Sequence, residues 1–294
     1  MLNWTRAGAV EGPRTLQIRL QRSYPGRVRA GAPVPTRSMS TEEVRANIGY
    51  FTDTRPRGVP VTALVLSGVG AASRPDLPEL VAFARDRGVQ TVVLHAGVED
   101  LAGLDPAALP VDRLVLPLQP GDAGAALAEA ADALGRAARA GRAVAVHTVL
   151  SPSAIPLLPA ISRVAAMSQA RSFTLTFPFP VDGAPASEVD PAPRAVAALN
   201  EVIPALEARG LSVAIKGLPV CYLGSLARLV YRTANRWYAD ADHQLAKALL
   251  FFPDVVAFHK EDDCRFCPAD SRCDGFFATY LRRPGFPRLI PLGA

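Results

Sequence analysis

Residues 61–95 read VTALVLSGVGAASRPDLPELVAFARDRGVQTVVLH, and this stretch decides the fold. The apolar run at residues 61–66 predicts a buried strand, and residues 77–87 predict a helix that Gly88 closes. A second apolar run at residues 89–95 predicts the next strand. Because a helix links the two strands, we expect them to lie parallel, with a right-handed crossover between them.

The same alternation continues on both sides of this stretch. It predicts strands at residues 15–20, 111–118, 143–150, 172–177 and 211–215, helices at 41–53, 123–140, 154–167 and 192–209, and a helical turn at 104–109. Such alternation is typical of an α/β protein with a parallel sheet. The sequence therefore predicts a partial (β/α)6-type parallel barrel, although an open doubly wound sheet fits as well. In both folds the carboxyl ends of the strands carry the site.

The chain changes character after Pro219. We predict three parts: a basic lead-in at residues 1–14, the α/β barrel at 15–219, and a small Cys-rich subdomain at 220–294. Within the last part we expect helices at 223–237 and 240–251, a short helix at 276–281, and an extended tail at 286–292 that covers the rest. Arg228, Arg232 and Arg236 would then share one helix face, either to bind an acidic peptide or as a solvated surface.

All four cysteines of the chain lie in this last part, with the spacing C-x42-C-x2-C-x5-C. They are Cys221, Cys264, Cys267 and Cys273. Four thiolates complete the coordination of one zinc ion or of one iron–sulfur cubane. Four unrelated thiols or two disulfides are the alternative, but clustered cysteines in a chain without a secretion signal favour a metal. The sequence thus predicts a metal centre and leaves iron–sulfur and zinc open.

Charge and hydropathy exclude several classes of protein. Residues 1–40 hold seven arginines and one acid, Glu11, which suits an acidic partner or a solvated entry segment. Few aromatic residues interleave these arginines, so a nucleic-acid partner is not expected. The first residues lead into charge and not into an apolar run, and no run of ~18 apolar residues occurs. We therefore expect a soluble cytoplasmic protein with no membrane partner.

The order of these segments resembles that of radical SAM enzymes. Residues 61–89 are similar to the second strand and helix of that family, residues 39–44 to its first helix, and residues 91–97 to its third strand. Residues 218–223, 264–267, 273–275 and 280–281 resemble the C-terminal auxiliary-cluster (twitch or SPASM-like) region of its peptide-modifying members. The resemblance implies a [4Fe-4S] cluster on the four cysteines. It also implies an S-adenosylmethionine (SAM) site at Ser67, Gly68 and Gly70.

Two departures from the family pattern concern the SAM-cleaving machinery. The family holds its SAM-cleaving cluster with C-x3-C-x2-C after the first strand, but residues 21–40 contain no cysteine. The family's Gly-Gly-Glu-Pro turn reads Gly68-Val69-Gly70-Ala71 here, so the carboxylate that would meet the cofactor amine is missing from the turn. The resemblance therefore implies a degenerate member, a pseudoenzyme, in which Ser67, Gly68 and Gly70 are vestigial.

Two functions follow as hypotheses. In the first, the chain lacks the SAM-cleaving cluster, keeps one auxiliary [4Fe-4S] cluster, and serves as a partner or substrate-binding subunit for an active radical SAM enzyme that modifies a peptide or other natural product. In the second, it is an enzyme of another class that uses barrel-mouth residues, with a structural zinc or iron–sulfur site at the C-terminus. His95 and His147 are then the candidate catalytic residues, since both fall at predicted strand ends. Hydrogen-bonded strand-end histidines would explain them equally.

Overall fold

The protein, described here from a computed structural model, is a mixed α/β structure with a large parallel sheet. The structure describes residues 4–5, 8–9, 12–21, 37–53, 59–101, 104–118, 125–178, 192–232, 235–251, 258–284 and 286–293. Nine strands follow the order β11-β10-β3-β4-β5-β6-β7-β8-β9. The α/β class expected from the sequence is confirmed, and this sheet is consistent with a partial (β/α)6-type barrel. The chain divides into two compact units, which we describe in turn.

Unit 1 consists of residues 1–117, 136–144 and 235–251. Its main strands are β3 (Thr15–Arg19), β4 (Ala63–Ser67), β5 (Thr91–His95), β6 (Arg113–Leu118, up to residue 117), β10 (Arg236–Ala239) and β11 (Leu249–Phe251). Its helices are α1 (Thr41–Thr52), α3 (Leu77–Asp86), α4 (Val98–Leu101) and the 3-10 turn η1 (Pro106–Ala108). The expected lead-in contains a short antiparallel pair, β1 (Trp4–Thr5) with β2 (Gly8–Ala9).

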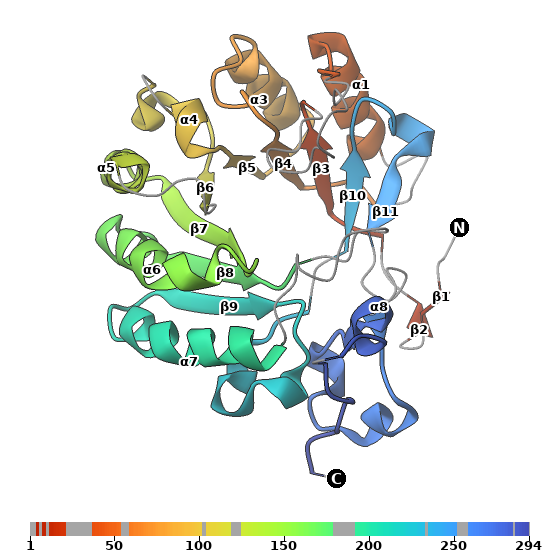
Figure 1. The fold of residues 1–294 in the computed structure, drawn as a ribbon. Coiled ribbons are helices and arrows are strands. Elements are labelled where there is room, and N and C mark those ends of the chain that lie inside the picture. Colours follow the sequence, from red (N-terminus) through yellow and green to blue (C-terminus); the bar gives the residue numbers. More distant parts are fainter. Residues whose placement is uncertain are drawn as a thin grey trace, which may run out of the picture. The chain divides into compact units, whose positions relative to one another are not determined.

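The strands of unit 1 bury one face completely. Leu16 and Ile18 of β3 and Leu64 and Leu66 of β4 are fully buried, and the residues between them are half-buried. Helices α1 and α3 run along the outside of these strands (Figure 1). Alternating side chains therefore divide the sheet into an apolar face under the helices and a more polar inner face.

Unit 2 consists of residues 118–135, 145–234 and 252–294. Its strands are β7 (Ala143–Val149, from residue 145), β8 (Ser172–Thr176) and β9 (Ser212–Lys216). Its helices include α5 (Ala125–Arg139, up to residue 135), the 3-10 turn η2 (Ile155–Leu157), α6 (Leu158–Met167) and α7 (Ala192–Glu207). Helices α6 and α7 flank β8 and β9 (Figure 1), and Phe173, Leu175 and Ile215 are fully buried. Beyond β9 the unit contains η4 (Val220–Tyr222), η5 (Gly224–Leu229), β12 (Phe258–His259), η7 (Asp262–Phe266), η8 (Asp270–Arg272), β13 (Phe276–Phe277) and α8 (Ala278–Leu281).

The two helices expected between residues 223 and 251 do not form, and that prediction is wrong. Residues 224–229 make a 3-10 turn, β10 pairs parallel with β3, and β11 pairs antiparallel with β10. The aromatic pair Trp237-Tyr238 suits a strand, and β3 offers an edge for it, so tertiary pairing overrides the local helical pattern. The helix expected at 276–281 is also shorter, because Phe276 and Phe277 form a strand before α8.

The same change separates the three arginines that were expected on one helix face. Arg228 bonds Glu207 through both of its terminal nitrogens, whereas Arg232 bonds the buried Asp274 at 3.2 Å. Arg236 lies in β10. The expected basic stripe therefore does not exist, because each arginine sits in a different local structure.

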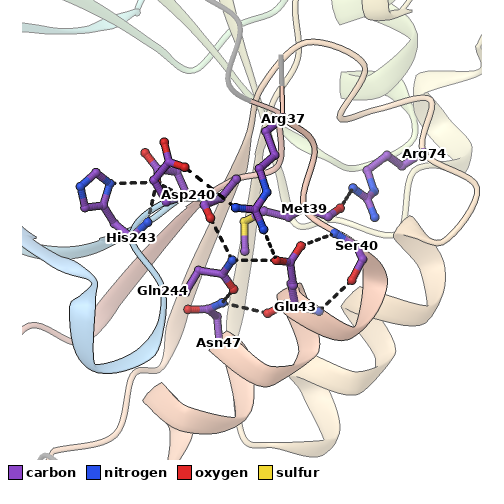
Figure 2. Close-up of polar contacts among 11 residues, drawn as sticks. Arg37, Met39, Ser40, Glu43, Asn47, Arg74, Asp240, His243 and Gln244 are labelled. Atoms are coloured by element: carbon purple, nitrogen blue, oxygen red, sulfur yellow. Dashed lines mark hydrogen bonds and ion pairs between the residues drawn. The ribbon is translucent and has the colours of Figure 1, made fainter. Parts of the chain in front are cut away.

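The turn between β10 and β11 is fastened to α1 by polar contacts. Figure 2 shows Glu43 of α1 accepting hydrogen bonds from Gln244 and Arg37, each 2.9 Å long. The fully buried Asn47 donates to Gln244 at 3.0 Å and accepts from the backbone N–H of Leu245 at 2.9 Å. Helix α1 itself begins with a capping box between Ser40 and Glu43, as its sequence indicates. These contacts hold α1 against the turn that follows β10.

Among the helices of the described ranges, none is long and apolar enough to cross a membrane.

Candidate metal centre

The four cysteines converge on one pocket in unit 2. Cys221, Cys264, Cys267 and Cys273 all line a cavity of about 20 Å³, and each is half-buried and free of a disulfide. Cys221 lies in η4 directly after β9, and the other three lie more than forty residues further along the chain, around η7 and η8. The disulfide alternative is therefore not what the structure shows. The four thiols therefore line one pocket, and their role as metal ligands stays a prediction.

Short 3-10 turns present the last three cysteines. The N–H of Cys267 donates to the carbonyl of Cys264 at 3.0 Å, and the N–H of Asp270 donates to the carbonyl of Cys267 at 2.9 Å. Cys267 ends η7 and Cys273 ends η8, so a cysteine stands at the exit of each turn. Successive tight turns bring thiols of a C-x2-C-x5-C segment to the same side of the chain.

The thiols lie close enough to affect one another's ionisation. Burial raises the pKa of the Cys221 thiol, and the nearby Cys273 and Cys264 raise it further. Burial likewise raises the pKa of Cys264, with added effects from Cys273 and Cys267. Like charges gathered in one place are unfavourable unless a cation offsets them. This mutual repulsion is what a bound metal cation would relieve.

Gly275 shapes the pocket next to Cys273. Its N–H donates to the Sγ of Cys273 at 3.3 Å, and its φ of +86° lies in the left-handed region. A Cβ atom on this residue would stand 2.2 Å from the carbonyl oxygen of His259. The antiparallel pair β12–β13 sets that approach, since His259 is the partner of Phe276. Only glycine can therefore deliver this backbone hydrogen bond to the sulfur.

A lysine and the C-terminal tail complete the pocket. Lys260 lines it together with Asp270, and the Lys260 Nζ bonds the Asp270 carboxylate at 2.6 Å and the Asp270 carbonyl at 2.9 Å. From the tail, the buried Leu289 and the half-buried Pro291 also line it, which agrees with the covering role expected for residues 286–292. The neighbouring Asp262 and Asp263 are exposed, whereas Lys260 is half-buried.

An aromatic cluster supports the segment from Cys273 to the tail. Tyr280 is buried, packs on Phe177, Phe276 and Phe286 at ring-centroid distances of 5.3 to 5.7 Å, and donates to the carbonyl of Pro178 at 3.1 Å. Tyr222, beside Cys221, packs edge-on against Phe276 at 5.4 Å and donates to the carbonyl of Pro287. Tyr280 is thus a core residue of the segment that follows Cys273.

The donor set suits a soft metal, although a formed coordination sphere is not in place. Four thiols are the donor set of an all-thiolate zinc ion or an iron–sulfur cluster, and the one carboxylate among the lining residues, that of Asp270, is bonded to Lys260. Within the described ranges, no group of three or more His, Cys, Asp or Glu side chains has the spacing of a preformed metal site. The cavity volume of about 20 Å³ corresponds to about one water-sized sphere. Side-chain rotation would therefore have to accompany binding.

A second polar region lies at the carboxyl ends of the strands in unit 1. Arg19 and Ser67 are register partners on β3 and β4, and His95 ends the next strand. Gly68, with φ +121°, approaches Gln21 so closely that a Cβ would stand 2.8 Å from the Gln21 nitrogen. The sequence region 22–36, where the family's three cysteines would be, lies outside the described residues.

A carboxylate reaches the turn after β4 from another element. Asp100 of α4 accepts from the N–H of Gly70 at 2.7 Å and from the N–H of Gly97 at 3.2 Å. Sequence reasoning missed Asp100, because it compared only the turn residues themselves. The available signal was Gly97 followed by two acids at the start of a short helix. The turn containing Gly68 and Gly70 is thus closed by the protein's own carboxylate.

The two candidate histidines belong to different units. His95 ends β5 in unit 1, and His147 lies in β7 in unit 2, where its Nε2 is 3.0 Å from the Thr176 hydroxyl. Thr176 is in turn the register partner of Lys216 on β9. His147 therefore has the hydrogen bond expected of a structural histidine near a strand end.

Comparison of structures finds solved chains with a similar fold, whereas comparison of sequences finds none. No family model matches the sequence, and no curated protein matches it significantly. A crystal structure of SuiB from Streptococcus suis is similar with a TM-score of 0.53 and 10% identity, and the match covers 79% of this chain and 59% of that one. A structure of Streptococcus suis SuiB bound to S-adenosylmethionine is similar with a TM-score of 0.57 and 10% identity, covering 94% of this chain and 75% of that one. The chain thus spans less than two thirds of the first SuiB chain.

Proposed function

We propose that this protein is a degenerate radical SAM-like protein that keeps one thiolate-bound auxiliary centre, a [4Fe-4S] cluster with zinc as the alternative. Cys221, Cys264, Cys267 and Cys273 would hold it. The observation that carries the proposal is their convergence on one pocket from segments far apart in sequence. When bound, a fully thiolate-ligated centre would supply structural cross-linking or electron transfer.

The chain's own residues would prepare this site in three ways. The N–H of Gly275 would hold the Cys273 sulfur through its hydrogen bond. Leu289 and Pro291 would exclude water from the thiols. The 3-10 turns ending at Cys267 and Cys273 would fix the backbone positions from which the two sulfurs reach the metal. Backbone hydrogen bonds to sulfur and a dry surrounding shell are what tune such centres.

The barrel part supports the loss of SAM cleavage. Residues 21–40 contain no cysteine to hold a SAM-cleaving cluster. The Gly70 N–H in the turn is already bonded to Asp100, which reduces what this turn offers to a ligand. SuiB has been solved with SAM bound; for this chain, SAM binding at Ser67, Gly68 and Gly70 would at most be a remnant. We infer a pseudoenzyme that acts as partner or substrate-binding subunit of an active radical SAM enzyme in peptide or natural-product modification.

Metal analysis tests the centre. Protein purified without oxygen should contain iron and sulfide in equal amounts, and Cys221→Ser, Cys264→Ser or Cys273→Ser should lose most of both. If the protein contains one zinc ion per chain and no sulfide, the centre is the zinc alternative and not an iron–sulfur cluster. Wild-type protein that holds neither metal would overturn the proposal.

Co-purification tests the role. If neighbouring genes encode a radical SAM enzyme and a precursor peptide, the tagged protein expressed with them should retain one or both through washing. Retention should depend on the intact four-cysteine site if the C-terminal region forms the interface. A protein that binds neither enzyme nor peptide would contradict the partner role while leaving the metal centre standing.

A further inference from the structure

Lys260 is the one basic side chain among the described residues that line the cysteine pocket. Its side chain is 21% exposed, so most of its stem is withdrawn from water beside the thiols. The Nζ is not free to swing away, because Asp270 binds it through both the carboxylate, at 2.6 Å, and the backbone carbonyl, at 2.9 Å. A single ammonium group is therefore held next to four potential thiolates.

A metal bound by four thiolates would carry a negative charge, and a nearby ammonium group would stabilise it. Metal binding requires deprotonated thiols, so four thiolates around a dication leave a net charge of about −2. In a partly buried pocket this charge is weakly screened. A fixed cation stabilises the anionic centre and makes addition of an electron easier. A neutral side chain of similar length would do neither.

Asp270 gives the pair its geometry. It begins η8, its N–H bonds the carbonyl of Cys267, and its own carbonyl accepts from the N–H of Cys273 at 3.4 Å. The Asp270 carboxylate partly neutralises the positive charge of Lys260 beside the thiols. The Asp270 carbonyl holds the ammonium in place without adding a negative charge. The two contacts therefore have opposite electrostatic consequences that substitutions can separate.

We propose that Lys260 is the counter-charge of an all-thiolate metal centre, positioned by Asp270, and that it sets both the metal affinity and the reduction potential of that centre. This inference rests on the proposed function, because it requires the four cysteines to hold a metal. In this role Lys260 does not touch the metal. It acts on the thiolates by its charge and is not itself a ligand.

Competition titrations with Co²⁺ and with Zn²⁺ test the inference on full-length protein freed of metal under reducing conditions. Lys260→Met should lower the affinity for both ions by roughly tenfold, whereas Lys260→Arg should stay close to wild type because it keeps the charge. Asp270→Asn keeps the carbonyl contact and removes the opposing charge, so its affinity should equal or exceed that of wild type. The loss in Lys260→Met should shrink as salt is raised. In iron-loaded protein, Lys260→Met should lower the reduction potential.

The outcomes separate the two proposals. If Lys260 only held the segment from Cys264 to Cys273 in place, Lys260→Met and Asp270→Asn would lose metal affinity equally, and the loss would not depend on salt. That result would overturn the counter-charge role. Wild-type affinity in Lys260→Met would also overturn it, while the metal centre stood. A wild-type protein that takes up neither Co²⁺ nor Zn²⁺ with thiolate charge-transfer bands would refute the proposed function and the inference together. Thermal melts of the metal-free variants control for misfolding.

Discussion

At the scale of single residues, the shape of the cysteine pocket depends on a glycine as much as on the thiols. Gly275 combines a left-handed φ with an approach to His259 that leaves no room for a Cβ. Its N–H also reaches the Cys273 sulfur. A substitution here strains the backbone, pushes β12 from β13 and removes a hydrogen bond from a thiolate, all through one methyl group.

Gly275→Ala should therefore lose metal and stability together. Gly210→Ala is a matched control, since Gly210 has a φ of +78° and open space around its missing Cβ. The control should cost about 1–2 kcal/mol from backbone strain alone. Gly275→Ala should cost more than that and should lower the bound metal per chain, measured by thermal melts and metal analysis. Equal stability of the two variants would show that the clash with His259 is relieved without consequence.

A carboxylate in unit 1 should make stability depend on acid pH. Hydrogen bonds from Arg74 and Thr41 hold the pKa of Asp76 at about 2, below its usual 3.8, and burial opposes them only in part. Because the folded pKa is lower than the unfolded one, the ionised carboxylate stabilises the protein fully above pH ~4 and loses this effect as pH falls towards 2. The contribution is at most roughly 2 kcal/mol.

Denaturant titrations from pH 6 to pH 2.5 measure this dependence. Asp76→Asn should be less stable than wild type at pH 6, and the difference should narrow as pH falls below 4. A difference that stays constant over the whole range would mean that Asp76 acts by shape and not by charge.

At the scale of elements, α1 and the β10–β11 turn depend on one buried amide. Asn47 donates to the Glu43 carbonyl at 2.8 Å and to Gln244, and it accepts from the N–H of Leu245, which has a positive φ of 53°. The side chain thus holds an unfavourable backbone conformation in the turn as well as satisfying three polar groups. Figure 2 shows how it lies between the helix and the turn.

Asn47→Ala should destabilise unit 1 by about 2–3 kcal/mol, because it leaves buried polar groups without partners. Asn200→Ala is the control: Asn200 makes the same bond to the carbonyl four residues earlier, but on an exposed face of α7. It should change stability by less than about 0.5 kcal/mol. Chemical denaturation followed by circular dichroism measures both variants, and Trp237 fluorescence reports on Asn47→Ala in addition, since Trp237 packs on Phe51 of α1 at 5.3 Å. A small effect of Asn47→Ala would mean that water replaces its contacts.

At the scale of the whole molecule, the metal centre should stabilise one part of the chain and not all of it. The pocket is built by residues 219–221, 260–275 and 289–291, all in unit 2. Removing the metal should therefore increase hydrogen exchange in 258–291 by at least tenfold while leaving β3, β4 and β5 unchanged. Exchange that rises equally throughout would show that the centre supports the whole fold.

SAM binding is a further whole-molecule test, because the similar SuiB structure contains SAM and this chain keeps the fold. We expect no SAM cleavage under reducing conditions and, in calorimetry, binding weaker than roughly 100 μM. Asp100→Ala, which frees the Gly70 N–H, is the informative variant. Reductive cleavage of SAM by the wild-type protein would contradict the degenerate assignment directly.

The sequence by itself determined the order of the main strands and helices from residue 15 to residue 216, apart from the short helix α4, and the identity of the four thiols. Hydrophobic runs of strand length and glycine-closed helices are local signals, and C-x2-C is a local motif, so no knowledge of distant contacts was needed. Only the tertiary structure decided that residues 236–251 become strands, since their partner β3 lies more than two hundred residues earlier. It also decided the roles of Lys260, Asp100 and Gly275. Each acts through a contact with a residue that is near in space, and the spacing of residues in the sequence does not encode these contacts.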